Sequence, residues 1–271
     1  WSWFAGDHIK EFGFSPAGLE YLRNRIARNP VEPYGYLEIN TLQRVGENKW
    51  FDSGDKRFAP DNLIINSRKG NVILIISRET GQVVWRLGPD YPGSEFVQDR
   101  RIGEKTLPRP VDQLSGEHNP HIIPKGLPGA GNMLIFDNQG GAGFPHAALG
   151  IYAGSRILEI NPQTEEIVWQ YTGESSGRPP ASFFSSFISN SQRLPNGNTL
   201  ITEGINGRLF QVTPDGDIVW EYVNPYPDVS TRNGKRFVNH SVYRAQAVSY
   251  DWIPAGTPRQ EKAVDPGERL R

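Results

Sequence analysis

The stretch LSGEHNPHIIP holds the side chains of this chain that are best suited to chemistry. It contains two of the five histidines, His118 and His121, and a neutral imidazole can attack as a nucleophile, accept a proton or bind a metal ion. Side chains three apart in a strand point to opposite faces, so both rings meet one ligand only where Asn119-Pro120 interrupts the strand. With Glu38 or Glu117 the pair could also bind a metal ion. A catalytic centre, a metal site and a strand end with structural histidines all remain open.

Four further side chains suit the recognition of a substrate. The guanidinium of Arg68 can bind an anion through a planar fork of donors, or form a surface ion pair. Asn40 lies at a strand start, where its amide can bind a ligand or cap a turn. Tyr243 and Arg244 lie in the last strand candidate, in the position that His118 has in its own segment. We expect all four, with Asn119, to contact the substrate.

The elements that position these residues form a repeat. Three segments share one pattern: DNLIINSRKGNVILIISRETGQVVWRLG, GNMLIFDNQG…SRILEINPQTEEIVWQYTG and GNTLITEGINGRLFQVTPDGDIVWEY. Each contains an apolar strand, a turn with glycine, an alternating strand, a second turn and a strand that carries a tryptophan. The equivalent tryptophans are Trp85, Trp169 and Trp220. The period-two alternation and the Asp215-Gly216 turn indicate β-hairpins, and one more strand candidate precedes each segment.

Four short antiparallel strands per repeat, closed by an aromatic residue, predict a β-propeller blade. A β-sandwich with similar hairpins is the alternative, and the repetition favours the propeller. The predicted fold class is therefore all-β, a propeller of about three complete four-stranded blades plus partial blades. The tryptophan spacing is uneven, so we expect insertions at Tyr91 to Gln113 and Gln139 to Gly154.

The two ends of the chain resemble parts of further blades. WSWFAG resembles the last strand of an earlier blade, and SVYRAQAVSYDWIP resembles the first strand of another. Propellers have about four to eight blades, and natural proteins avoid open sheet edges. We therefore expect an N-terminal fragment of the same protein, or a second chain, to supply the missing blades. The expected domains are a partial propeller over 1–254, with a helical excursion over 15–29, and a polar tail over 255–271.

Composition excludes several classes of function. The net charge of −1 gives no electrostatic reason to expect nucleic acid or a membrane surface as partner. The absence of cysteine removes disulfides and thiolate chemistry. The sequence contains neither a Walker-type nor a dinucleotide fingerprint. We expect no cofactor.

Several strings resemble the arylsulfotransferase (arylsulfate sulfotransferase) family: GDKRFAPDNLIINSR, TGQVVWRLGPDY, HIIPKGLPGAGNMLIFDN and FISNSQRLPNGNTLITEGINGRLFQVTPDGDIVWEYVNP. The resemblance runs from about Trp1 to Pro254. It implies a six-bladed propeller with the active site in its central channel. It also implies an exported protein, secreted or periplasmic, that moves a sulfuryl group from one phenol to another through a sulfated histidine.

The resemblance also implies roles for individual residues. The family's Gln-His motif, which carries the nucleophile, corresponds to Glu117-His118. Its Ser-Ser-Arg motif corresponds to Asn66-Ser67-Arg68, and its His-x-Asn pair to Glu38-Ile39-Asn40. The last two hold the sulfuryl oxygens. Glu38 therefore stands where the family has a histidine.

This departure affects the expected reaction. Two like charges about 4 Å apart repel by roughly 4 kcal/mol at an effective dielectric of about 20, which corresponds to about a thousandfold in rate. An ionised Glu38 would thus oppose a sulfate. A carboxylate that faces a histidine suits acid–base work such as hydrolysis or elimination. We expect a phenolic or anionic substrate with His118, Glu38 and His121 as catalytic groups; the alternatives are a non-catalytic binding propeller and a His/carboxylate metal site.

Overall fold

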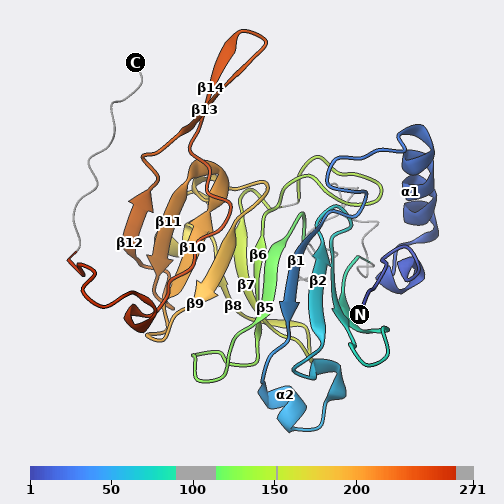
Figure 1. Ribbon diagram of the computed structural model, residues 1–271, viewed down its shortest axis with the longest axis horizontal. Coiled ribbons are helices and arrows are strands. Elements are labelled where there is room, and N and C mark those ends of the chain that lie inside the picture. The colour runs from blue at the N-terminus through green and yellow to red at the C-terminus, as the bar shows by residue number, and fades with distance from the viewer. Residues whose placement is uncertain (90–113, 151, 261–271) are drawn as a thin grey trace.

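Three four-stranded antiparallel sheets form the body of the protein, and a two-stranded hairpin projects from it (Figure 1). The structure is a computed structural model that describes residues 1–89, 114–150 and 152–260. The first sheet contains β1 (Ile39–Arg44), β2 (Leu63–Ser67), β3 (Val72–Ile76) and β4 (Val83–Leu87). The second contains β5 (His118–Ile122), β6 (Met133–Asp137), β7 (Arg156–Asn161) and β8 (Glu166–Tyr171). The third contains β9 (Asn190–Arg193), β10 (Thr199–Glu203), β11 (Arg208–Val212) and β12 (Ile218–Val223).

The remaining elements are short or peripheral. The hairpin consists of β13 (Asp228–Arg232) and β14 (Lys235–Asn239). The helices are α1 (Pro16–Arg28), α2 (Lys49–Asp52), η1 (Ile9–Phe12), η2 (Lys56–Phe58), η5 (Gly173–Ser176), η6 (Pro180–Ser182), η7 (Gly204–Asn206) and η8 (Tyr250–Trp252). None of the helices in the described ranges has both the length and the apolar character that crossing a membrane requires.

The three sheets repeat one another down to an irregularity of the backbone. In each sheet the third and fourth strands shift register just after the residue that pairs with the tryptophan. Trp85 pairs with Ile75, Trp169 with Glu159 and Trp220 with Gln211. A β-bulge at a fixed place increases the local twist, so the sheets share their shape as well as their strand order. The sequence repeat therefore corresponds to a structural repeat.

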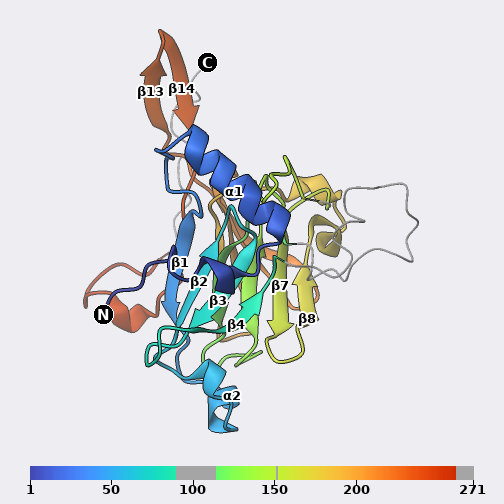
Figure 2. The same cartoon turned by 90° about the vertical axis from the view of Figure 1, so that its right-hand side faces the viewer.

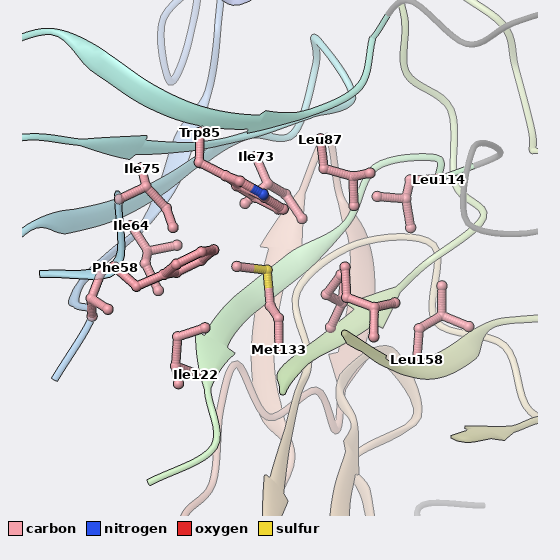
Figure 3. Packing of buried hydrophobic residues seen from close by; sticks show 13 residues of the cluster. Phe58, Ile64, Ile73, Ile75, Trp85, Leu87, Leu114, Ile122, Met133 and Leu158 are labelled. Carbon is pink, nitrogen blue, oxygen red and sulfur yellow. The ribbon is translucent and has the colours of Figure 1, made fainter. Parts of the chain in front are cut away.

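Apolar side chains fill the space between neighbouring sheets. Alternate residues of β6 serve the two interfaces: Met133 and Ile135 pack against the first sheet, and Leu134 and Phe136 pack against the third. Figure 3 shows the first interface, where Met133 lies among side chains of both sheets. A strand buried on both faces needs an apolar residue at every position, which explains the continuous run MLIF in β6.

A tryptophan hydrogen bond accompanies each of these interfaces. The indole Nε1–H of Trp85 donates to the carbonyl of Pro162, in the β7–β8 turn, at 2.8 Å. The indole of Trp169 donates to the carbonyl of Pro214, in the β11–β12 turn, also at 2.8 Å. Each outer strand is thereby connected to the outer turn of the next sheet. We call this contact the tryptophan latch.

The N-terminal segment covers the other face of the first sheet. Phe12 and Phe14 pack against Ile65 and Leu74 in a separate apolar cluster, and α1 lies across this side of the sheet (Figure 2). Ser15 caps α1, because its Oγ accepts the amide of Gly18 at 3.1 Å. Trp3 belongs to this segment, and its indole donates to the carbonyl of Gly81 in the β3–β4 turn at 2.9 Å, which resembles the tryptophan latch although Trp3 is not in a strand.

The two strands expected at the ends of the chain do not form in the structure. Residues 1–4 have no regular secondary structure, and neither do residues 240–249. A strand needs a hydrogen-bonded neighbour, and neither segment belongs to any of the described sheets. Of the two expected insertions, Gln139 to Gly154 contains a tight bridge between Ala142 and Ala147, and Tyr91 to Gln113 lies outside the described residues.

Candidate active site

The first strands of the three sheets, β1, β5 and β9, are the innermost ones and lie side by side (Figure 1). Polar side chains connect these strands to the next inner segment of the chain. The hydroxyl of Thr41 in β1 accepts the amide of Asn119 in β5 at 3.0 Å. The side chain of Asn190 in β9 exchanges two hydrogen bonds with the backbone of Ala245, at 2.8 and 3.1 Å. The predicted site residues therefore gather along one inner wall.

His118 is fixed in this wall by three contacts. Its Nε2 accepts the amide N–H of Ile188 at 3.1 Å. A backbone amide can only donate, so the proton of the neutral ring lies on Nδ1. Nδ1 lies 2.7 Å from Oδ1 of Asn138 and 3.0 Å from the carbonyl of Gly116. Asn138 is oriented in turn, because its Nδ2 donates to the carbonyls of Ser185 and Ile188.

The surroundings keep His118 neutral. The ring is only 2% exposed, and burial lowers its pKa to about 4 against the hydrogen bond of Asn138, with further lowering by the charges of Arg68 and Arg244. At neutral pH the ring therefore has a lone pair on Nε2. A neutral imidazole is the form that attacks or accepts a proton.

Glu38, where the family resemblance implies a histidine, forms ion pairs. Its Oε2 lies 3.6 Å from Nη1 of Arg68 and 3.8 Å from Nζ of Lys69. Arg68 also donates through Nη2 to the carbonyl of Ser186 at 3.2 Å. The carboxylate therefore does not face a substrate as an isolated negative charge. The repulsion expected from the sequence is reduced by two neighbouring cations.

Three donors at the predicted site have no acceptor within the described ranges. They are Nε of Arg68, Nε of Arg244 and Nδ2 of Asn40, and all three atoms are buried. A buried donor without a partner costs about 1–3 kcal/mol, and two of these belong to the guanidiniums that lower the pKa of His118. Unsatisfied cationic donors beside a neutral histidine suit a ligand with negatively charged oxygens.

Asn119 has a left-handed backbone, with φ of 53°. The register of β5 against β6 shifts here: His118 pairs with Phe136 and His121 with Leu134. Because Phe136 and Leu134 are two residues apart, both histidines lie on the same face of the sheet. The break that the sequence required at Asn119-Pro120 is therefore present.

His121 lines a different part of the wall from His118. Its Nδ1 lies 2.9 Å from the carbonyl of Asn119, and burial lowers its pKa. A cavity of about 480 Å³ adjoins it, with Asn119, Ser191, Arg193 and Gln246 in its lining. His118 is not among the residues that line this cavity. The two histidines therefore share a face but not this cavity.

The strained backbone of the site could not be read from the sequence. Glu38, Ile188 and Ser189 have φ values of 50°, 55° and 91°. Such values are costly for residues other than glycine, above all for a β-branched isoleucine, and they cluster at functional sites. Sequence reasoning found His118 but missed Ile188 and Asn138, because neither residue type suggests chemistry by itself.

The geometry gives little support to a binding role for Tyr243 or to the hypothesis of a metal site. The carbonyl of Tyr243 accepts the amide of Ser189 at 3.0 Å, but the residue is 53% exposed, whereas Arg244 is half-buried and its Nε is buried. Within the ranges that the structure describes, no three His, Asp or Glu side chains gather closely enough to bind a metal ion. A centre of His118, His121 and Glu38 therefore has no support.

Repeated four-stranded sheets around an inner polar wall define the fold class as a β-propeller, as predicted. A profile of the arylsulfotransferase (ASST) family matches residues 35–244. The chain belongs to the arylsulfotransferase family. The match covers every predicted site residue, from Glu38 to Arg244. No curated protein matches the chain.

Comparison with solved structures gives more distant similarities. A Bacteroides caccae protein of unknown function is 16% identical over 65% of this chain and 48% of its own, with a TM-score of 0.32. The WD40 β-propeller domain of Doa1 is 12% identical over 75% and 48%, with a TM-score of 0.37. Saccharomyces cerevisiae Sqt1 is 11% identical over 75% and 56%, with a TM-score of 0.30. The chain thus spans about half the length of these structures.

Proposed function

We propose that this protein transfers a sulfuryl group between phenolic compounds, with His118 as the nucleophile. The observation that carries the proposal is a neutral histidine whose pKa is lowered by Arg68 and Arg244, both of which have a buried, unpaired Nε. Asn40, on the first strand of the first sheet, adds a third buried, unpaired donor. Family membership supports the same reaction class. Export of the protein, which the family resemblance implies, is part of the proposal.

The reaction has two displacements. The lone pair on Nε2 of His118 attacks sulfur, an N–S bond forms, and the bond from sulfur to the aryl oxygen breaks, which releases an aryloxide. The acceptor phenol then attacks sulfur and the N–S bond breaks. The proton that the acceptor loses balances the proton that the aryloxide takes up. Arg68, Arg244 and Asn40 bind the sulfuryl oxygens, where charge accumulates in the transition state.

Two observations constrain this chemistry. Nε2 of His118 accepts the amide of Ile188, so the strained segment at Ile188 and Ser189 must shift before attack. Glu38 stands where the family has a histidine and pairs with Arg68. This pairing supports a second candidate, an acid–base hydrolase or lyase reaction on the same kind of substrate, with Glu38 and His121 as further catalytic groups and Asn119 and Tyr243 as binding groups.

A third candidate is a binding propeller without catalysis. Thr41 and Asn190 accept backbone amides of the next inner segment, as His118 does. His118 therefore also fits a purely structural role.

Incubation of the assembled protein with a nitrophenyl sulfate donor and a phenol acceptor tests the proposal. We expect nitrophenolate release that depends on the acceptor, and a mass increase of one sulfuryl group on the peptide that contains His118. Turnover of carboxylate or ester substrates without sulfation would favour the second candidate. Ligand binding without turnover would favour the third.

A further inference from the structure

The cavity of about 480 Å³ beside His121 is lined by the innermost strands of all three sheets. Gln43 belongs to β1, Asn119 and His121 belong to β5, and Ser191 belongs to β9. Sites for small molecules have volumes of about 300–1,000 Å³, so this cavity can hold one. His118 does not line it, so a molecule bound here occupies a different place from a sulfuryl donor at that histidine.

The charged side chains in the lining are already paired. Each of the three cations has a carboxylate partner, and the pairs are Arg44 with Asp61, Lys125 with Asp52, and Arg193 with Glu159. The carboxylate of Glu47, also in the lining, lies 4.0 Å from Nζ of Lys125. A cation beside a carboxylate attracts an anion only weakly, because the two charges oppose each other. The cavity therefore favours an uncharged ligand, whereas Arg68 and Arg244 near His118 have unpaired donors.

His121 offers a hydrogen-bond acceptor to the cavity. Its Nδ1 lies 2.9 Å from the carbonyl of Asn119. A carbonyl can only accept, so the proton of the neutral ring lies on Nδ1 and Nε2 has a lone pair. None of the described residues donates to Nε2, and burial lowers the pKa of the ring, which keeps it neutral near pH 7. A ligand can therefore donate a proton to Nε2 in a hydrogen bond.

Ser191 offers a hydroxyl from the neighbouring inner strand. The residue is 1% exposed, and its Oγ is buried without a partner in the described part of the chain. A buried hydroxyl without a partner is unfavourable, and a ligand oxygen in the cavity would relieve this. The side-chain amides of Gln43 and Asn119 likewise form no hydrogen bond to a described residue, and each can both donate and accept.

We propose that this cavity binds an uncharged ring compound that has neighbouring hydroxyl groups. One hydroxyl donates to Nε2 of His121, and another accepts the Oγ–H of Ser191 and bonds to the amide of Asn119. A hydroxyl suits these groups because it donates and accepts at the same atom. The ring carbons contact Ile122 and Leu127, which are apolar side chains of the lining. Phenols with adjacent hydroxyls and sugars both have this chemistry, and neither needs the histidine nucleophile at His118 in order to bind.

Nuclear magnetic resonance of the intact protein, labelled with ¹⁵N in its histidine rings, tests the proposal. The probes are catechol, glucose and, as an anionic comparison, phenyl sulfate. We expect catechol, glucose or both to move the Nε2 signal of His121 until it saturates, and phenyl sulfate to leave that signal unchanged. A response to catechol alone identifies a phenolic ligand, and a response to glucose alone identifies a sugar. If neither neutral probe moves the signal at millimolar concentration, or if phenyl sulfate moves it further, the proposal is wrong.

A matched pair of hydroxyl variants separates binding from a folding defect. Ser191→Ala removes the unpaired hydroxyl of the cavity. Thr202→Val removes a comparable one, because Oγ1 of Thr202 is also buried and unpaired in the described ranges, but Thr202 does not line the cavity. We expect Ser191→Ala to raise Kd for the bound probe by about five- to tenfold and Thr202→Val to leave it unchanged. Neither variant loses a hydrogen bond to a described residue, so both should keep the melting temperature of the unaltered protein.

His121→Phe tests the acceptor in the same way. The variant keeps a ring at this position but removes Nε2, so Kd for the probe should rise by about tenfold or more. The ¹⁵N signal of His118 reports on the other site in the same samples, which lets the two proposals succeed or fail separately. Equal Kd values in Ser191→Ala, His121→Phe and Thr202→Val would overturn the proposed binding mode.

Discussion

The backbone amide of Ile188 donates to Nε2 of His118 at 3.1 Å, and this contact separates a catalytic from a structural role of the histidine. In the third sheet an asparagine, Asn190, makes the corresponding contact with the amide of Ala245. Asparagine can therefore replace His118 as a hydrogen-bond acceptor but not as a nucleophile.

His118→Asn is the sharpest variant for this reason. We expect the sulfuryl transfer rate to fall by about a thousandfold or more, since the nucleophile is lost, while the melting temperature stays within a few degrees. Steady-state kinetics and thermal unfolding of the same preparation check this. Gln170→Ala, on the exposed side of β8, is the control and should change neither value. Retained transfer in His118→Asn would show that the histidine is structural.

Because Glu38 forms an ion pair with Arg68, we expect substitution of either residue to change KM for an anionic sulfuryl donor. Glu38→Gln removes the charge that partly neutralises Arg68 and Lys69, so KM for an anionic donor should fall by about three- to tenfold, whereas Arg68→Ala should raise it. Glu38→His restores the family residue and should raise kcat for an aryl sulfate. Initial rates over a range of donor concentrations give KM and kcat for each of these variants. An increase of KM in Glu38→Gln would mean that the carboxylate binds the substrate directly.

Burial of Glu117 predicts how stability depends on pH. Desolvation raises the pKa of this carboxyl from its ordinary value of 4.5 to about 8. Between these values the folded protein binds more protons than the unfolded chain, so this group makes stability fall as pH rises. Glu117→Gln removes that loss. The free energy of unfolding of Glu117→Gln, relative to that of the unaltered protein, should therefore grow by about 1.4 kcal/mol per pH unit across this window. Urea titrations from pH 5 to 8 measure this difference. A constant difference would place the carboxyl in a solvated site.

The lowered pKa of His118 predicts the acid limit of the activity. The ring is neutral above about pH 4 in the folded protein and above 6.5 in the unfolded chain. The transfer rate should therefore be constant from pH 8 to about 5 and fall below that as the ring is protonated. The stability contribution of this residue is present above pH 6.5 and is lost as pH falls towards 4. A rate that already declines near pH 6.5 would mean that the ring is solvated in the active state.

Equivalent tryptophans should differ in their contribution to stability. Trp85→Ala removes a side chain from the core between two sheets and should cost about 3–5 kcal/mol. Trp220 is 38% exposed, so Trp220→Ala should cost less than about 1 kcal/mol. Urea unfolding of both variants compares them. Similar losses would mean that Trp220 is already packed within the chain.

Much of the fold follows from the sequence because its period is local. The alternation, the turn glycines and the tryptophan of each segment are set by neighbouring residues, and the structure has a four-stranded sheet at each. The site depends on contacts between distant segments. Sequence reasoning placed His118 and Arg68 on an inner wall, but it could not find that Glu38 pairs with Lys69, because neither the positive φ of Glu38 nor the direction of its side chain can be read from the residue types. It could not find the Ile188 contact either, since 70 residues separate the partners.

The cover that Phe12 and Phe14 form over the first sheet limits how the protein can assemble. A heterologous contact that is repeated head to tail gives a filament unless it closes into a ring. Because the N-terminal residues already cover one face of the first sheet, that face is not available to a second copy. A head-to-tail contact between copies through this face is therefore disfavoured, and with it one route to fibres.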